Sequence, residues 1–259
     1  HVEDFPLELP QKATAPMALF DYDKARNYRL VVPTGKKLLN YDIEGKAVSG
    51  WKFSPAGSPL VSRPQHFAVQ GRDLLVIRSK EGKIHLLNRR GQPRFKLERK
   101  IDELRGPFYI RPGPSLRQSE LLCHSNSGKL YIVHPTGSID ALFLEPSQPA
   151  DQYRFLDGRH LLSHRRKLMV KHPEHPFQAS FPEPISHPPK IYQRKEKLYA
   201  GAYSEEAQEI RLYDGKGRLI PGFPVYAQGP FDMGSLRRNS VINVVTSSRD
   251  GSVICYALR

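Results

Sequence analysis

Three of the ten histidines lie close together in the sequence and beside acidic residues, an arrangement that could hold a metal ion. His172, His175 and His187 stand near Glu174 and Glu183. Imidazole and carboxylate groups are common zinc ligands, but zinc sites usually place them at short, regular spacings. These residues instead occur in a proline-rich segment without a regular spacing. We therefore expect structural or solvent-exposed histidines here rather than a metal site.

The sequence contains none of the common catalytic motifs. It has no Gly-x-Ser-x-Gly element, no phosphate-binding glycine-rich loop and no dinucleotide fingerprint. Glu205 and Glu206 fall at an expected loop tip, where water keeps carboxylates ionised and makes them poor general acids. We predict that the chain is not an enzyme, with no catalytic residues. An enzyme whose active site lies in the funnel of the fold remains an alternative, because one fold can host many activities.

The composition is strongly basic. The 259 residues include 40 Lys and Arg against 26 Asp and Glu, for a formal net charge of +14. Such a charge favours anionic partners, although a solvated basic surface is the simpler interpretation. The basic residues occur in pairs and triplets along the whole chain, so a site for an anionic polymer would have to be assembled by the fold.

Because no apolar run approaches 18 residues, we expect neither a membrane span nor a signal peptide in the chain. Because the chain begins at His1 rather than at methionine, we expect a mature or excised piece. The two cysteines, Cys123 and Cys255, lie in apolar runs, and we predict two separate core residues rather than a disulfide.

A unit of strand, tight turn and strand recurs along the chain. Its clearest copy is 209–225, where alternating apolar residues lead into a turn at Asp214 and Gly215. Successive copies are 46, 46, 37, 43 and 43 residues apart, counted between the turn residues Asp42, Asn88, His134, Lys171, Asp214 and Ala257. This period is typical of a β-propeller, in which each blade is a sheet of four short strands.

The predicted fold is therefore an all-β, six-bladed β-propeller of four-stranded blades that forms a single domain over residues 1–259. The expected blades are 17–53, 66–97, 107–144, 152–181, 189–225 and 230–259. The last blade ends one strand short, and the segment 4–9 is similar in sequence to the outer strand near 222–226. We expect 4–9 to complete the last blade and to close the ring.

In a propeller the first strand of each blade lines a central channel, and ligands usually bind where the loops surround one end of it. On this basis the predicted ligand-binding residues are His66, Phe67, Arg63, Phe108, Tyr109, Arg111, Phe231, Asp232 and Arg237. The arginines would suit phosphate, sulfate or carboxylate groups if they fall on one face. The alternative is that the aromatic side chains only fill the axis of the propeller.

Several segments, among them 20–23, 27–33, 39–46, 64–67 and 250–256, carry a family resemblance. They resemble the C-terminal propeller of large Bacteroidota proteins of unassigned function and, more distantly, quinoprotein-like and FG-GAP propellers. The nearer resemblance implies an accessory propeller of a longer polypeptide in the periplasm or cell envelope, and it implies no activity.

The more distant resemblance raises two cofactor questions. In FG-GAP propellers an acidic loop holds calcium, and Asp21 and Asp23 are weak candidates for such a loop here. Calcium needs six to eight oxygen ligands, whereas Lys24 and Arg26 follow directly, so we expect a carboxylate-stabilised turn and no metal. A quinone cofactor is not expected, because Trp51 is the single tryptophan.

We therefore predict a non-enzymatic propeller module, without a cofactor, that binds or scaffolds a protein partner within a larger bacterial envelope protein. It would be monomeric or part of a longer chain. The alternative is a binder of nucleic acid, lipopolysaccharide or acidic glycan through a basic rim. The dependence of binding on salt would separate the two, because only the complex with a polyanion weakens steeply as salt rises.

Overall fold

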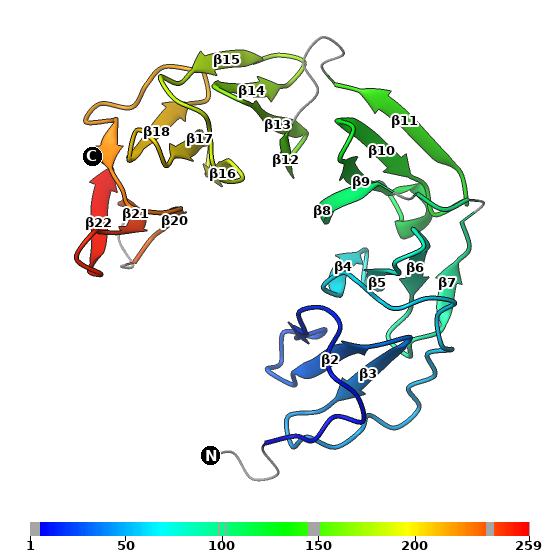
Figure 1. Ribbon diagram of the computed structural model, residues 1–259. Coiled ribbons are helices and arrows are strands. Elements are labelled where there is room, and N and C mark those ends of the chain that lie inside the picture. Colours follow the sequence, from blue (N-terminus) through cyan, green and yellow to red (C-terminus); the bar gives the residue numbers. More distant parts are fainter. Residues whose placement is uncertain (1–5, 98, 102, 145–150, 237–240, 259) are drawn as a thin grey trace. The chain divides into compact units, whose positions relative to one another are not determined.

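Antiparallel β-sheets make up the fold. The computed structural model describes residues 6–97, 99–101, 103–144, 151–236 and 241–258 (Figure 1). Within these residues it has 22 strands, one short 3-10 helix, η1 (Leu116–Gln118), and no α-helix. The predicted all-β class is therefore confirmed. No helix in the described ranges is long and apolar enough to cross a membrane.

The chain divides into two compact units, residues 1–142 and 143–259. The first unit carries three sheets, whose strands follow one another in the order of the sequence. The first sheet consists of β1 (Ala18–Phe20), β2 (Arg29–Thr34) and β3 (Lys37–Tyr41). The second consists of β4 (Gln65–Val69), β5 (Arg72–Arg78), β6 (Ile84–Leu87) and β7 (Pro93–Phe95). The third consists of β8 (Leu104–Arg111), β9 (Glu120–Ser125), β10 (Lys129–Val133) and β11 (Ile139–Phe143), which reaches the boundary between the units.

The second unit carries the remaining three sheets. Its first sheet consists of β12 (Gln152–Leu156), β13 (Arg159–His164), β14 (Lys167–Lys171) and β15 (Phe177–Ser180). The next consists of β16 (Lys190–Arg194), β17 (Lys197–Ser204), β18 (Glu209–Asp214) and β19 (Val225–Tyr226). The last consists of β20 (Asp232–Gly234), β21 (Ile242–Ser247) and β22 (Val253–Leu258).

The middle strands β5 and β17 are buried on both faces. On β5, Leu74 and Val76 belong to the core between the second and third sheets, whereas Leu75 and Ile77 belong to the core between the first and second. Successive side chains of a strand point to opposite faces, so a continuous apolar run fills two cores at once. In the second unit β17 does the same, with Ala200 facing one core and Tyr199 the other.

A side-chain hydrogen-bonded turn recurs after the third strand. The Oδ1 atoms of Asp42, Asn88 and Asp214 each accept hydrogen bonds from the backbone N–H groups two and four residues later. The glycine three residues after each donates its N–H to the carbonyl oxygen of that Asp or Asn. These glycines have φ near +75° to +78°, a left-handed conformation that glycine adopts without strain. The recurrent turns read from the sequence at these three positions are thus confirmed.

Four sheets have four strands, as predicted, and the first and last have three each among the described residues. In the first sheet the expected fourth strand is reduced to an isolated bridge between Tyr41 and Ala47, after which Lys52 N–H bonds Arg90 C=O beside the second sheet. Residues 6–9 form no strand, and residues 1–5 lie outside the described part of the chain. Closure of a ring by 4–9, and a single domain over 1–259, stay predictions.

The cysteines differ from each other in burial. Both have free thiols, as predicted, and Cys123 is buried in the core between the second and third sheets. Cys255 is exposed, so its prediction as a core residue is wrong. It lies on β22, which pairs only with β21 among the described strands, and it shares its exposed face with Val253. An apolar run in a strand at a sheet edge therefore does not guarantee two-sided burial.

The side chain of Gln65 joins the first strands of two neighbouring sheets. Its Oε1 accepts from the N–H of Phe108 at 2.7 Å, and its Nε2 donates to the C=O of the same residue at 2.9 Å. The amide thus satisfies both backbone groups of one residue, and it takes the place of a strand partner at that point of β8.

We predict that Gln65→Leu lowers the free energy of unfolding by about 1–3 kcal/mol, because a side chain of similar size leaves two partly buried backbone groups unpaired. Urea unfolding followed by circular dichroism measures the change. Gln92→Leu, at an exposed position, is the matched control and should change stability by less than about 0.5 kcal/mol. Equal effects of the two substitutions would show that the hydrogen bonds between the Gln65 side chain and the Phe108 backbone, called the Gln65 clamp here, contribute nothing to stability.

His85 on β6 is a partly buried histidine. Its ring makes an edge contact with Phe53 at 5.7 Å, and its Nε2 has no hydrogen-bond partner within the described residues. Burial, aided by the charge of Lys83, lowers the pKa of His85 to about 4.

In the unfolded chain, His85 therefore becomes protonated as the pH falls through about 6.5. In the folded chain, it becomes protonated only at about pH 4. The stability that this histidine lends is present above pH 6.5 and is lost as the pH falls toward 4. We predict that His85→Gln loses less stability than the parent chain over this interval. Urea midpoints at several pH values test this, and parallel curves for the two proteins would contradict it.

Candidate functional site

A pocket of about 600 Å³ lies in the first unit and is built by all three of its sheets. It is called the Arg63 pocket here. Its walls come from β1, from the segment before β4, and from β4, β5 and β8. The lining residues are Ala18, Phe20, Val61, Ser62, Arg63, Pro64, Gln65, His66, Arg78, Gly106 and Pro107.

The Arg63 pocket is basic. Arg63 is exposed, and Arg78 is half-buried and donates to the carbonyl oxygen of Leu104. Burial lowers the pKa of Arg78 from its ordinary value, but a guanidinium at this site keeps its charge. No carboxylate is among the lining residues. The pocket therefore presents two positive charges to a bound group without a neutralising partner in its wall.

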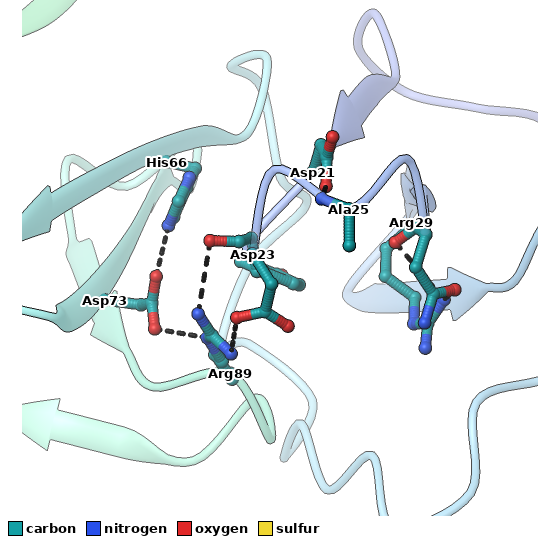
Figure 2. Close-up of polar contacts among 9 residues, drawn as sticks. Asp21, Asp23, Ala25, Arg29, His66, Asp73 and Arg89 are labelled. Atoms are coloured by element: carbon teal, nitrogen blue, oxygen red, sulfur yellow. Dashed lines mark hydrogen bonds and ion pairs between the residues drawn. The ribbon is translucent and has the colours of Figure 1, made fainter.

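A polar network supports the wall of the pocket at His66. The Nε2–H of His66 donates to Asp73 Oδ1 at 2.6 Å, and the other carboxylate oxygen of Asp73 accepts from Arg89 Nε. Arg89 also pairs through Nη1 with Asp23 at 2.7 Å and donates through Nη2 to the C=O of Tyr22 at 3.3 Å. Figure 2 shows this chain of contacts running from β4 to the loop that follows β1.

The register between β4 and β5 explains the contact between His66 and Asp73. Ala68 lies opposite Asp73, and His66 lies opposite Leu75, so His66 and Asp73 share a face as a diagonal pair. The Asp73 side chain is only 7% exposed, and a buried carboxylate is costly unless it is paired. Burial alone would lower the pKa of Arg89, but its hydrogen bonds to Asp73 and Asp23 outweigh burial and raise it.

The Tyr22 ring packs against two members of this network. Its ring lies 5.0 Å from the Arg89 guanidinium and makes an edge contact with His66 at 4.8 Å. Burial, with the charge of Asp73, raises the pKa of the Tyr22 hydroxyl, so this group stays neutral. The hydroxyl has no hydrogen-bond partner in the described part of the chain. The network therefore holds two loops against the second sheet, and His66 is its one member that lines the pocket.

The structure places the sequence-predicted site residues in several environments. Arg63 and His66 line one pocket. Phe67 and Phe108 pack in the core between the second and third sheets, and Tyr109 and Arg111 follow on β8, where Arg111 pairs with Glu120.

The remaining predicted residues belong to the second unit. Phe231 is buried in the core between its last two sheets. The exposed Asp232 forms an ion pair with Lys190, with 3.5 Å between Oδ1 and Nζ. Arg237 lies outside the described residues. The structure thus brings together two of the nine predicted residues in a pocket, and a common ligand-binding role for the set stays a prediction.

The metal candidates have other partners. Asp21 accepts from the N–H group of Ala25 at 3.1 Å (Figure 2). It also accepts from the N–H group of Arg26 at 3.0 Å, which completes the expected carboxylate-stabilised turn. Asp23 pairs with Arg89. The rings of His172 and His175 stack at 6.1 Å, and His187 packs on Tyr203. Among the described residues no group of three or more His, Cys, Asp or Glu side chains is placed to hold a metal ion.

Sequence reasoning missed Asp73, Arg89, Tyr22 and Arg78. One signal was available, because Asp73 directly precedes the apolar run 74–77, where a charged residue needs a partner. The sequence could not say which cation this is, since 40 lysines and arginines are spread along the chain.

Comparisons with solved structures define the class of fold as propeller-type. A structure of BBS1N in complex with ARL6DN matches with a TM-score of 0.64 at 13% identity, over 97% of this chain and 81% of that one. Streptogramin B lyase matches with a TM-score of 0.56 at 12% identity, over 98% and 86%. BamB from Moraxella catarrhalis matches with a TM-score of 0.50 at 15% identity, over 96% and 73%.

These neighbours are propeller-type folds, which agrees with the predicted architecture. At such identities the likeness concerns the fold alone. No family model and no curated protein matches the sequence. The predicted Bacteroidota family therefore rests on the sequence resemblance.

We predict that Asp73→Asn destabilises the chain by about 1–3 kcal/mol, because an uncharged amide replaces the buried carboxylate that His66 and Arg89 contact. Asp23→Asn is the matched control. It breaks a contact of the same guanidinium at a carboxylate that is 65% exposed, and it should cost less than about 1 kcal/mol. Urea unfolding of the two variants measures both values. A similar small loss for both would show that Asp73 does not anchor the network.

Proposed function

We propose that this chain is a non-enzymatic propeller module that binds a protein partner, and that the Arg63 pocket receives an acidic segment of that partner. The observation that carries the proposal is the pocket itself. It joins three sheets, it has two arginines and no carboxylate in its wall, and its volume of about 600 Å³ suits a few side chains.

Two further observations support protein binding. The BBS1N structure, which matches 97% of this chain, is a complex with another protein, ARL6DN. An apolar side chain is also exposed in the pocket wall itself, because Val61, near Arg63, is 37% exposed. An arginine that holds a carboxylate, next to exposed apolar groups, is a common combination at the centre of protein interfaces.

The fold leaves catalysis open, because streptogramin B lyase is built on it too. Within the pocket, however, His66 is held by Asp73 through Nε2, and no carboxylate lines the wall as a second acid or base. We therefore do not assign a reaction. The periplasm or cell envelope remains the proposed location, on the sequence resemblance alone.

The net charge of +14 supports the alternative, an anionic polymer. Such a complex would spread over many basic residues, so it would weaken steeply with salt and would hardly depend on any one arginine. A protein segment held in the Arg63 pocket would depend strongly on Arg63 and less on salt.

We predict that Arg63→Glu lowers capture of a specific protein from a cell-envelope extract at least tenfold, because it reverses the charge at the pocket mouth. The immobilised chain is washed at low and high salt after nuclease treatment, and bound proteins are quantified by mass spectrometry. Arg90→Glu makes the same change at an exposed residue outside the pocket and should leave capture unchanged. Equal capture by the two variants, or release of polymer alone by salt, would refute the proposal.

A further inference from the structure

A second pocket of the first unit is lined by three arginines. It has a volume of about 440 Å³ and is separate in its residues from the Arg63 pocket. It is called the Arg94 pocket here. Arg72 comes from the start of β5, Arg94 from β7, and Arg117 from η1. Phe95 and Leu116 add apolar surface, and both pack on the core between the second and third sheets.

The segments that carry the arginines are held in place by the fold. Gln70 and Gly71, with φ of 49° and 70°, form the tight turn between β4 and β5 that sets the position of Arg72. Leu116 is buried beside Arg117, so the short helix is anchored in the core. All three arginines therefore line the pocket from backbone segments that the fold holds in place.

The charges in this pocket are uncompensated. None of its lining residues is acidic, and within the described part of the chain none of the three arginines forms an ion pair. By contrast, Arg89, Arg111, Arg211 and Arg218 all have carboxylate partners. The Nε of Arg94 is buried and makes no hydrogen bond to any described residue. The three guanidinium charges of the pocket are therefore not balanced by any carboxylate of the described chain.

We propose that the Arg94 pocket binds the phosphate group of a small phosphate ester. Arginine presents a planar set of donors that matches the oxygens of phosphate, and three of them surround the charge of a phosphate dianion. The volume of about 440 Å³ is larger than a phosphate ion needs, and Phe95 and Leu116 offer apolar contact to an organic part of the ligand.

The first test uses inorganic phosphate as the probe. Calorimetric titration of the whole chain should show saturable binding of phosphate at a constant ionic strength set with sodium chloride, and phosphate should raise the melting temperature more than chloride does. Arg94→Gln should weaken binding at least tenfold, while Arg90→Gln should leave it unchanged. Because Arg94→Gln could also disturb β7, Arg117→Gln at an exposed position serves as a second variant with the same expected direction.

The second test compares phenyl phosphate with inorganic phosphate. The ester should bind at least tenfold more tightly, and the gain should disappear in Phe95→Ala. Phosphate binding that survives in both arginine variants, or no binding at all, would overturn the site. Equal affinity for the two probes would overturn the assignment of an ester. Capture through the Arg63 pocket involves other residues, so failure here leaves the proposed partner site untouched.

Discussion

The packing of the sheets depends on middle strands that are apolar on both faces. In β5 and β17, alternate side chains enter two different cores, so neither strand is stable in a sheet without neighbours on both sides. This constraint determines how consecutive sheets stack within each unit, and it sets where their first strands and connecting loops come together. Buried polar side chains, Asp73 among them, interrupt these cores at a few positions.

The Asp73 network is such an interruption. A carboxylate at the start of a buried strand costs free energy unless a cation reaches it, and Arg89 reaches it from the turn after β6. This turn is the repeated turn built on Asn88, so an element of the structural repeat also supplies the cation that pairs with Asp73. Through Asp23 and the C=O of Tyr22, the same arginine also holds the loop after β1.

The sequence predicted the elements of the fold well because their signals are local. Apolar alternation and the turn residues Asp42, Asn88 and Asp214 were enough to place most strands. The prediction was weaker where position depends on distant partners: β22 contains the same kind of apolar run, but Cys255 is exposed at the sheet edge.

For the site, Arg63 and His66 could be named because they precede or begin a first strand. The sequence could not show that Asp73 pairs with Arg89. It also could not show that one pocket is lined by Arg72, Arg94 and Arg117. These contacts join loops and strands from different repeats, and nothing in a basic sequence distinguishes one arginine from another.

The Gln65 clamp has a consequence for ligand binding. Gln65 lines the Arg63 pocket, and the backbone that it holds at Phe108 directly follows Gly106 and Pro107 in the opposite wall. The two walls are therefore tied together by the same amide that a ligand would touch. A pocket whose walls are fixed before binding loses little conformational entropy when it is filled, so more of the contact energy remains as affinity. Such preorganisation favours partners that fit the pocket as it stands over partners that would have to reshape it.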